Sequence, residues 1–74
     1  MTMQDLRRGE RAVVLKVDLP VLLKERLRSL GVFTGAKLSV LKVSGKKNVR
    51  LIQVGSAKIV LDGETAAGIR IWKI

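Results

Sequence analysis

The sequence predicts a mainly β protein: a small closed or partly open barrel of about five short strands, with one α-helix inserted after the first strand. The chain has 74 residues, which leaves room for one domain, and 47% of them are hydrophobic with a mean hydropathy of +0.23. This is far too apolar for a disordered chain. The apolar runs are short and separated by tight-turn residues, and closing such strands into a barrel removes the exposed edges of a small sheet.

The first predicted element is a strand at residues 11–17 (RAVVLKV), which follows Gly9 and a lead-in at residues 6–10. The run is rich in β-branched residues, which favour extended structure. Because almost every position is apolar, we expect this strand to be buried on nearly both faces.

The second predicted element is a helix over residues 20–30. Asp18 and Leu19 lead into Pro20 and offer a cap and a first-turn proline. A leucine stripe then follows at i, i+4 and i+7, made of Leu23, Leu27 and Leu30. Gly31 is expected to end the helix, because glycine adopts the left-handed conformation that commonly follows a helix.

The rest of the chain alternates between strands and turns. Strands are expected at residues 37–43, 49–54, 57–61 and 69–73, with turns at Thr34-Gly35, at residues 44–48 and at Gly55-Ser56. The hairpin at residues 44–48 would carry Lys46 and Lys47 at its tip. Asp62 is expected to cap a single helical turn that runs through Ala67.

The residue types that are missing exclude much chemistry. The sequence contains no Cys and no His, so it can form no disulfide, no thiol nucleophile and no zinc site of the usual ligand types. Its six carboxylates match no calcium-loop or paired-acid spacing, so neither a metal site nor a cofactor is expected. The serines have no histidine to act as a base, and the segment Gly31-x-x-x-Gly35 lacks the ending of a nucleotide-binding loop. We therefore do not expect an enzyme.

The balance of charge points to an anionic partner. Fifteen Lys and Arg against six Asp and Glu give a net charge of +9. Such a field attracts nucleic acid, anionic lipid headgroups or an acidic protein surface, and leaves these three classes open. No stretch approaches the roughly 18 consecutive apolar residues of a membrane span. The first nine residues also lack the apolar run of a secretory signal, so we expect a cytoplasmic protein.

The predicted helix carries three cations in two settings. Lys24 and Arg28 fall on the face opposite the leucine stripe, whereas Arg26 lies at the edge of the stripe. Arg26 has two interpretations: a side chain whose stem covers apolar surface, or a contact with a partner. Exposed apolar groups near Phe33 or Trp72 would carry affinity for a partner, although Trp72 could equally fill the core.

The order of these landmarks resembles a known family. A Leu-x-x-Gly lead-in precedes the Val-rich strand and is followed by the motif Arg26-Leu27-x-x-Leu30-Gly31-Val32-x-x-Gly35. Farther along, residues 55–61 are followed by Ala66 and Ile69. Across essentially the whole chain this pattern resembles the FeoA family, and its central motif is also similar to the FeoA-like domain of some metal-dependent transcription repressors.

The resemblance implies one FeoA-like domain over residues 1–74, an SH3-like barrel that acts in the cytoplasm beside FeoB, the membrane transporter coupled to ferrous iron uptake. We predict partner binding on the helix and the turn after it, residues 24–35, because this stretch is the most distinctive part of the sequence. The residues expected there are Lys24, Arg26, Arg28, Gly31, Phe33 and Gly35. For the two glycines, the turns that they form are the favoured explanation.

Two other functions stay open at this point. A small basic barrel could bind nucleic acid, although only two aromatic residues, Phe33 and Trp72, are available to stack on bases. The chain could also be a stand-alone relative of the repressor domain, and its sheet edges would allow copies to associate.

Overall fold

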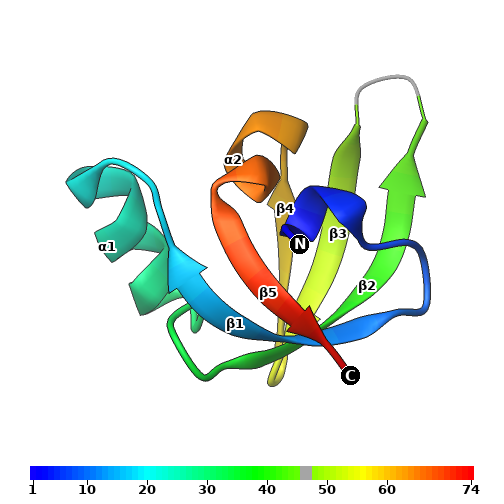
Figure 1. Ribbon diagram of the computed structural model, residues 1–74, viewed down its shortest axis with the longest axis horizontal. Helices are drawn as coiled ribbons and strands as arrows, with labels where there is room; N and C mark the ends of the chain where they lie inside the picture. The colour runs from blue at the N-terminus through cyan, green and yellow to red at the C-terminus, as the bar shows by residue number, and fades with distance from the viewer. Residues whose placement is uncertain (46–47) are drawn as a thin grey trace.

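The computed structural model describes residues 1–45 and 48–74. Its elements are η1 (Met3–Asp5), β1 (Arg11–Val17), α1 (Val21–Ser29), β2 (Lys37–Ser44), β3 (Val49–Val54), β4 (Ala57–Leu61), α2 (Gly63–Ala67) and β5 (Ile69–Lys73). The strands form one antiparallel sheet in the order β4-β3-β2-β1-β5 (Figure 1). The predicted fold class, mainly β with one helix after the first strand, is therefore confirmed.

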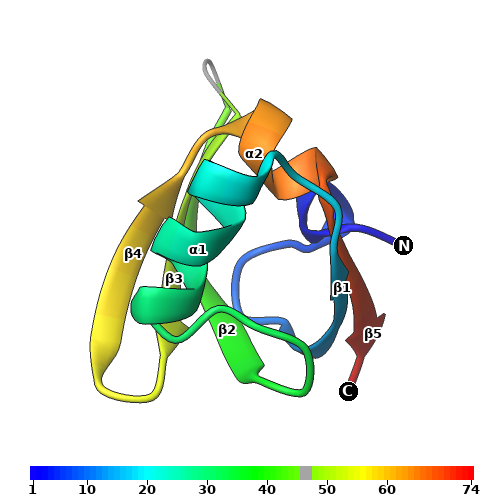
Figure 2. The ribbon, with the colours of Figure 1, turned by 90° about the vertical axis from the view of Figure 1, so that its left-hand side faces the viewer.

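The sheet curls so that β3 and β4 lie opposite β1 and β5, and α1 lies across the side between β4 and β1 (Figure 2). The inward side chains of all five strands meet in one core, together with those of the helix and the N-terminal turn. Buried core residues include Met3, Leu6, Val14, Leu27, Val32, Leu38, Val40, Ile52, Leu61, Ile69 and Ile71. Burying each such side chain contributes about 1.5–3 kcal/mol, which is how a chain of this size folds without disulfides.

The composition of β1 suggested burial on nearly both faces, and this expectation is wrong. The pairing of β1 with β5 shifts register between Val14 and Lys16, and Leu15 and Lys16 are both exposed. A bulge adds one residue to a strand and locally changes the alternation of its side chains. Here Leu15 keeps the outward position that alternation from Ala12 and Val14 gives it, and the bulge adds Lys16 to the same side before Val17 returns to the core.

α1 is shorter than predicted and starts differently. It covers Val21–Ser29, with Pro20 at its N-cap and no side-chain hydrogen bond there, so the expected cap by Asp18 is wrong. Of the leucine stripe, Leu27 is buried, Leu23 is half-buried and Leu30 is 44% exposed. The stripe loses Leu30 because the helix has already ended there and the chain is turning away.

The later strands begin and end close to where the sequence placed them. The turn residues Gly35 and Gly55 have φ of +92° and +59°, and Asp62 caps α2 by accepting the Thr65 N–H at 2.7 Å. β2 and β3 pair as the predicted hairpin, whose tip residues Lys46 and Lys47 lie outside the described residues.

The N-terminal turn η1 was not predicted. Thr2 caps it, and the Asp5 carboxylate in return accepts the Thr2 N–H at 2.9 Å. This reciprocal capping box satisfies backbone groups at the start of the turn, which places Met3 and Leu6 in the core.

Candidate functional site

The candidate site is α1 with the segment that follows it to Gly35, which we call the helix–turn face. The helix ends in a Schellman motif: the Val32 N–H donates to the Leu27 carbonyl at 2.8 Å and the Gly31 N–H donates to the Arg28 carbonyl at 3.0 Å. Gly31 has φ of +101°, a conformation that costs glycine little. The helix end is therefore closed by hydrogen bonds and by two buried side chains, Leu27 and Val32.

The turn after the helix is tied to β1. The Gly35 N–H donates to the Val14 carbonyl at 2.8 Å, and the Val14 N–H donates to the Ala36 carbonyl at 2.8 Å. Phe33 lies between the closed helix end at Val32 and the anchored Gly35, and is 47% exposed. The segment thus holds an aromatic ring at the surface on a backbone that is fixed at both ends.

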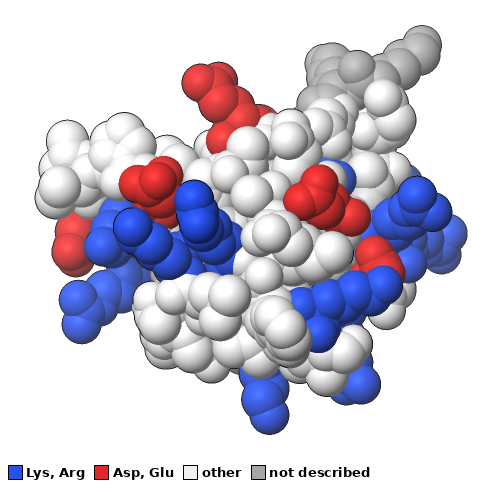
Figure 3. All heavy atoms as spheres, in the orientation of Figure 1, with Lys and Arg blue, Asp and Glu red and all other residues white. Residues whose placement is uncertain are grey.

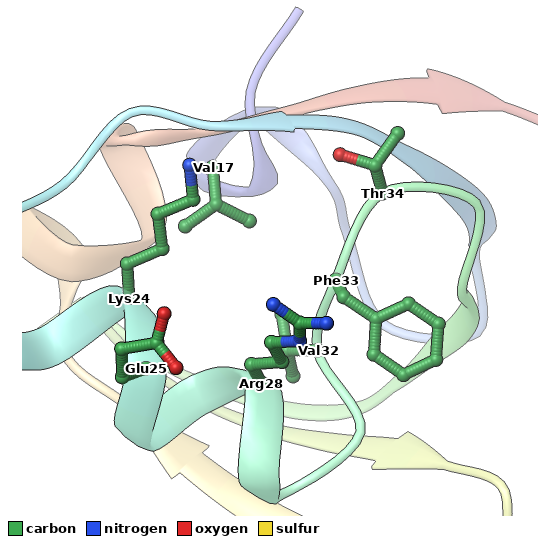
Figure 4. Close-up of a pocket in the computed structure, with 7 residues that line it drawn as sticks. All are labelled: Val17, Lys24, Glu25, Arg28, Val32, Phe33 and Thr34. Atoms are coloured by element: carbon green, nitrogen blue, oxygen red, sulfur yellow. The ribbon is translucent and has the colours of Figure 1, made fainter. Parts of the chain in front are cut away.

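A hollow opens between α1, the end of β1 and this turn (Figure 4). It is lined by Val17, Lys24, Glu25, Arg28, Val32, Phe33 and Thr34. In Figure 4 the Arg28 guanidinium points toward the Phe33 ring, and Lys24 extends toward Val17. The hollow has a volume of about 280 Å³, just below the roughly 300–1,000 Å³ of small-molecule sites, so it suits a side chain of a partner.

The predicted site residues do not all meet in this hollow. Lys24, Arg28 and Phe33 line it, but Arg26 lies on the other flank of α1, in a groove beside β4 that is also lined by Val60 and Asp62. Gly31 and Gly35 shape the turn: a Cβ at Gly31 would lie 3.3 Å from Val54 Cγ1, whereas at Gly35 it would meet nothing within 4 Å. The helix therefore presents two separate basic flanks.

Lys24, Arg26 and Arg28 form no salt bridge within the described residues, although the Glu25 carboxylate lines the same hollow as Lys24 and Arg28. Among residues 1–45 and 48–74 the one ion pair joins Lys73 to Glu10, at the end of β5. Hydrogen bonding to Lys73 and to the Arg7 N–H lowers the pKa of Glu10, and hydrogen bonds from Thr65 lower the pKa of Asp62. These two carboxylates thus serve local structure, and the helix cations remain available to an anionic partner.

Sequence reasoning missed Arg50, a charged side chain in the core that is 4% exposed. Its Nη1 donates to Asn48 Oδ1 at 2.8 Å and its Nη2 donates to the Gln4 carbonyl, while Nε has no partner in the described part of the chain. Arg50 therefore joins the N-terminal turn to β3. Strict alternation in β3 would have found it, since Arg50 shares the inward row with Ile52 and Val54.

Within the described ranges, no group of three or more His, Cys, Asp and Glu could hold a metal ion. No helix in those ranges is both long and apolar enough to cross a membrane. Figure 3 shows the face that carries β1 and β5, where blue Lys and Arg clusters lie between uncharged surface and several red carboxylates.

A curved five-stranded antiparallel sheet with a helix inserted after its first strand is the SH3-like fold, and it defines a class of small β proteins. The FeoA domain model matches residues 1–72, and the chain belongs to the FeoA family, which is associated with ferrous iron transport. No curated protein matched the sequence.

Solved structures agree with this assignment. The FeoA protein from Chlorobium tepidum is 27% identical, with a TM-score of 0.93 over 100% of this chain and 70% of that one. Stenotrophomonas maltophilia FeoA, a prokaryotic SH3 domain protein solved with zinc, is 28% identical, with a TM-score of 0.81 over 96% of this chain and 88% of that one. A manganese-dependent transcriptional repressor has a TM-score of 0.88 at 19% identity, with 41% of its length covered, and shares the fold alone.

Proposed function

We propose that this chain is a cytoplasmic accessory protein of ferrous iron uptake, which acts as one domain over residues 1–74 and binds a FeoB-type transporter without catalysing a reaction. Membership of the FeoA family supports the process. The observation that carries the binding role is the helix–turn face, where Lys24 and Arg28 line the same hollow as the exposed ring of Phe33 and form no ion pair in the described ranges.

The two kinds of side chain contribute differently to such a contact. Rim cations steer an acidic surface toward the site and mainly raise the association rate. A half-exposed aromatic ring beside a hollow gains most from desolvation, and residues of this kind are enriched among binding hot spots. We therefore assign most of the affinity to Phe33, orientation to Lys24 and Arg28, and a second, weaker contact to Arg26. Gly31 and Gly35 act through the shape of the turn.

The test is a binding measurement with a purified FeoB-type transporter at about 0.15 M ionic strength, where the screening length is about 8 Å. We expect Phe33→Ala to weaken binding by about 30-fold or more, as a hot spot does. The double variant Lys24→Glu/Arg28→Glu should slow association and make it less sensitive to salt. Arg26→Glu is the matched control on the opposite flank and should have a smaller effect.

The possible results separate the proposal from its rivals. Unchanged binding by folded Phe33→Ala and Lys24→Glu/Arg28→Glu would move the interface away from the hollow, and a dominant effect of Arg26→Glu would move it to the groove beside β4. If the wild-type protein bound no transporter, the accessory function would be wrong.

Nucleic acid is the second candidate, favoured by the net charge of +9. It predicts that a pull-down from bacterial extract recovers nucleic acid that is lost as salt rises, because phosphate contacts release counterions. Recovery of a transporter that survives nuclease treatment would instead favour the accessory role.

A further inference from the structure

The outer face of β1 and β5 carries an apolar patch that the fold leaves uncovered. It consists of Met1, Leu15 and Trp72, which are 62%, 50% and 69% exposed and line one shallow depression with Arg70. Large side chains of this kind are usually buried, and an exposed cluster rimmed by polar residues marks an interaction site. We call this cluster, with Lys16 and Arg70, the β1–β5 patch.

The backbone holds these residues outward. In β5 the buried residues Ile69 and Ile71 alternate with Arg70 and Trp72, so the indole cannot turn inward without exposing isoleucine. In β1 Leu15 alternates with the buried Val14 and so points outward, and the bulge that follows keeps Lys16 outward as well. Met1 is fixed beside β5 because its carbonyl accepts the Ile71 N–H at 3.0 Å. The patch is therefore a permanent feature of the barrel surface.

Two cations stand at the edge of this patch. Lys16 and Arg70 are paired across the β1 and β5 ladder, and like charges placed directly opposite each other are destabilising. Neither forms an ion pair within residues 1–45 and 48–74, and Glu10, near the end of β5, is already engaged by Lys73. The fold thus keeps a repulsive pair that an external anionic surface would neutralise.

We propose that the β1–β5 patch attaches the protein to an anionic membrane surface, with Trp72, Leu15 and Met1 entering the headgroup region and with Lys16 and Arg70 on lipid phosphates. Tryptophan prefers the interface between headgroups and acyl chains, and aliphatic tips beside cations are the composition of interfacial segments. The side chains project from an open strand face rather than line a deep cleft, which suits a bilayer better than an acidic peptide.

This attachment is independent of the transporter proposed above. Figure 2 shows α1 facing the viewer and β5 at the right-hand edge, so the helix–turn face and the β1–β5 patch point in different directions. A barrel lying on the membrane through β1 and β5 would keep the helix–turn face free for a protein. Experiments with lipid vesicles test the attachment without any transporter present.

The sequence contains a single tryptophan, so Trp72 reports on its own face. The experiment titrates the full chain with vesicles of phosphatidylcholine mixed with phosphatidylglycerol at about 0.15 M ionic strength, and follows both co-sedimentation and Trp72 emission. We expect binding with a blue shift of the emission as the indole leaves water. Pure phosphatidylcholine vesicles should bind much more weakly.

Variants identify the face that binds. Each basic residue near an anionic surface is worth about fivefold in affinity, so Lys16→Gln/Arg70→Gln should weaken binding by about 25-fold. Lys24→Gln/Arg28→Gln lowers the net charge by the same amount on the other face and should have a much smaller effect. Leu15→Glu should weaken binding by about tenfold or more, whereas Val60→Glu, at a 65% exposed position on β4, should leave the blue shift intact.

Three results would overturn the proposal. The first is a folded wild-type protein that gives no blue shift with anionic vesicles. The second is equal weakening by the two glutamine pairs, which would mean that net charge alone drives binding. The third is a blue shift with soluble polyglutamate as large as that with vesicles, which would assign the patch to an acidic polypeptide.

Discussion

The helix–turn face and the β1–β5 patch offer partners similar groups on very different supports. Both combine an exposed aromatic ring with cations that form no ion pair in the part of the chain that the structure describes. The helix–turn face is held to the barrel by one buried residue of α1, Leu27, and by the hydrogen bonds that close the end of the helix. The β1–β5 patch is built on strands: β1 lies between β2 and β5, and a bridge between Thr2 and Arg70 covers part of the outer edge of β5.

This difference teaches how a small barrel can serve two surfaces. Elements with few buried apolar contacts open locally at low free energy, and binding segments are often drawn from them. We therefore expect α1 to shift when a protein partner binds, while the turn stays anchored to β1. The β1–β5 patch should keep its shape, and a lipid surface would adapt to it.

The largest effect that would test this comparison is expected for Leu27→Ala. Truncating a buried leucine costs about 2–5 kcal/mol, and here the loss should fall on the docking of α1. Hydrogen exchange should show residues 24–30 losing protection while β1 and β5 keep theirs. Leu22→Ala is the matched control, since Leu22 is 87% exposed on the same helix and its truncation should change stability by less than about 0.5 kcal/mol.

Exchange that rises equally in α1, β1 and β5 of Leu27→Ala would contradict the comparison. The helix and the strands would then form one cooperative unit, and the two faces could not differ in rigidity.

Gly31→Ala should have the next largest effect, on the attachment of the helix end. A non-glycine residue at φ of +101° costs about 1–3 kcal/mol, and its Cβ would also press on Val54 at 3.3 Å. Thermal unfolding followed by circular dichroism measures the loss. Gly35→Ala shares the positive φ but has open space around it, so it should lose less; an equal loss in both variants would show that backbone strain alone, without the contact to Val54, sets the stability of the turn.

Most of the fold was predictable because its signals are local. Apolar runs separated by glycine-containing turns predicted the bounds of the strands to within about one residue, and Asp62 marked the start of α2. The misses have physical causes. The bulge in β1 depends on pairing with β5, which is distant in sequence. The turn η1 depends on reciprocal hydrogen bonds between Thr2 and Asp5, and the short segment that forms it has no periodic pattern that would predict them.

The location of the binding site stays a prediction, and the geometry of the predicted residues could be foreseen only in part. Helical periodicity correctly separated Arg26 from Lys24 and Arg28, but it could not show that the two flanks face different hollows, because these depend on β4 and on the end of β1. Trp72 stayed ambiguous between core and surface until the register of β5 placed Ile69 and Ile71 inside. The β1–β5 patch joins residues that are far apart in sequence, so no local pattern could reveal it.

The smallest expected effect concerns Glu10, which links the lead-in of β1 to Lys73 at the end of β5. The pKa of Glu10 is lowered by Lys73 and by the Arg7 N–H, so the folded state favours the carboxylate. Its contribution is therefore fully present above the ordinary pKa of 4.5 and is lost as pH falls through the lowered value. Glu10→Gln should be slightly less stable than the wild type at neutral pH, and the difference should shrink in acid.

Urea unfolding at a series of pH values measures this difference, with high salt as a second axis because exposed ion pairs are screened. A difference that grew as pH fell would mean that Glu10 is favoured in its protonated form, contrary to its contact with Lys73.

The variant Glu10→Gln also tests the comparison of the two faces when it is used in the vesicle titration. Releasing Lys73 from Glu10 adds a free cation beside Trp72, so Glu10→Gln should bind anionic vesicles more tightly while leaving the helix–turn face unchanged.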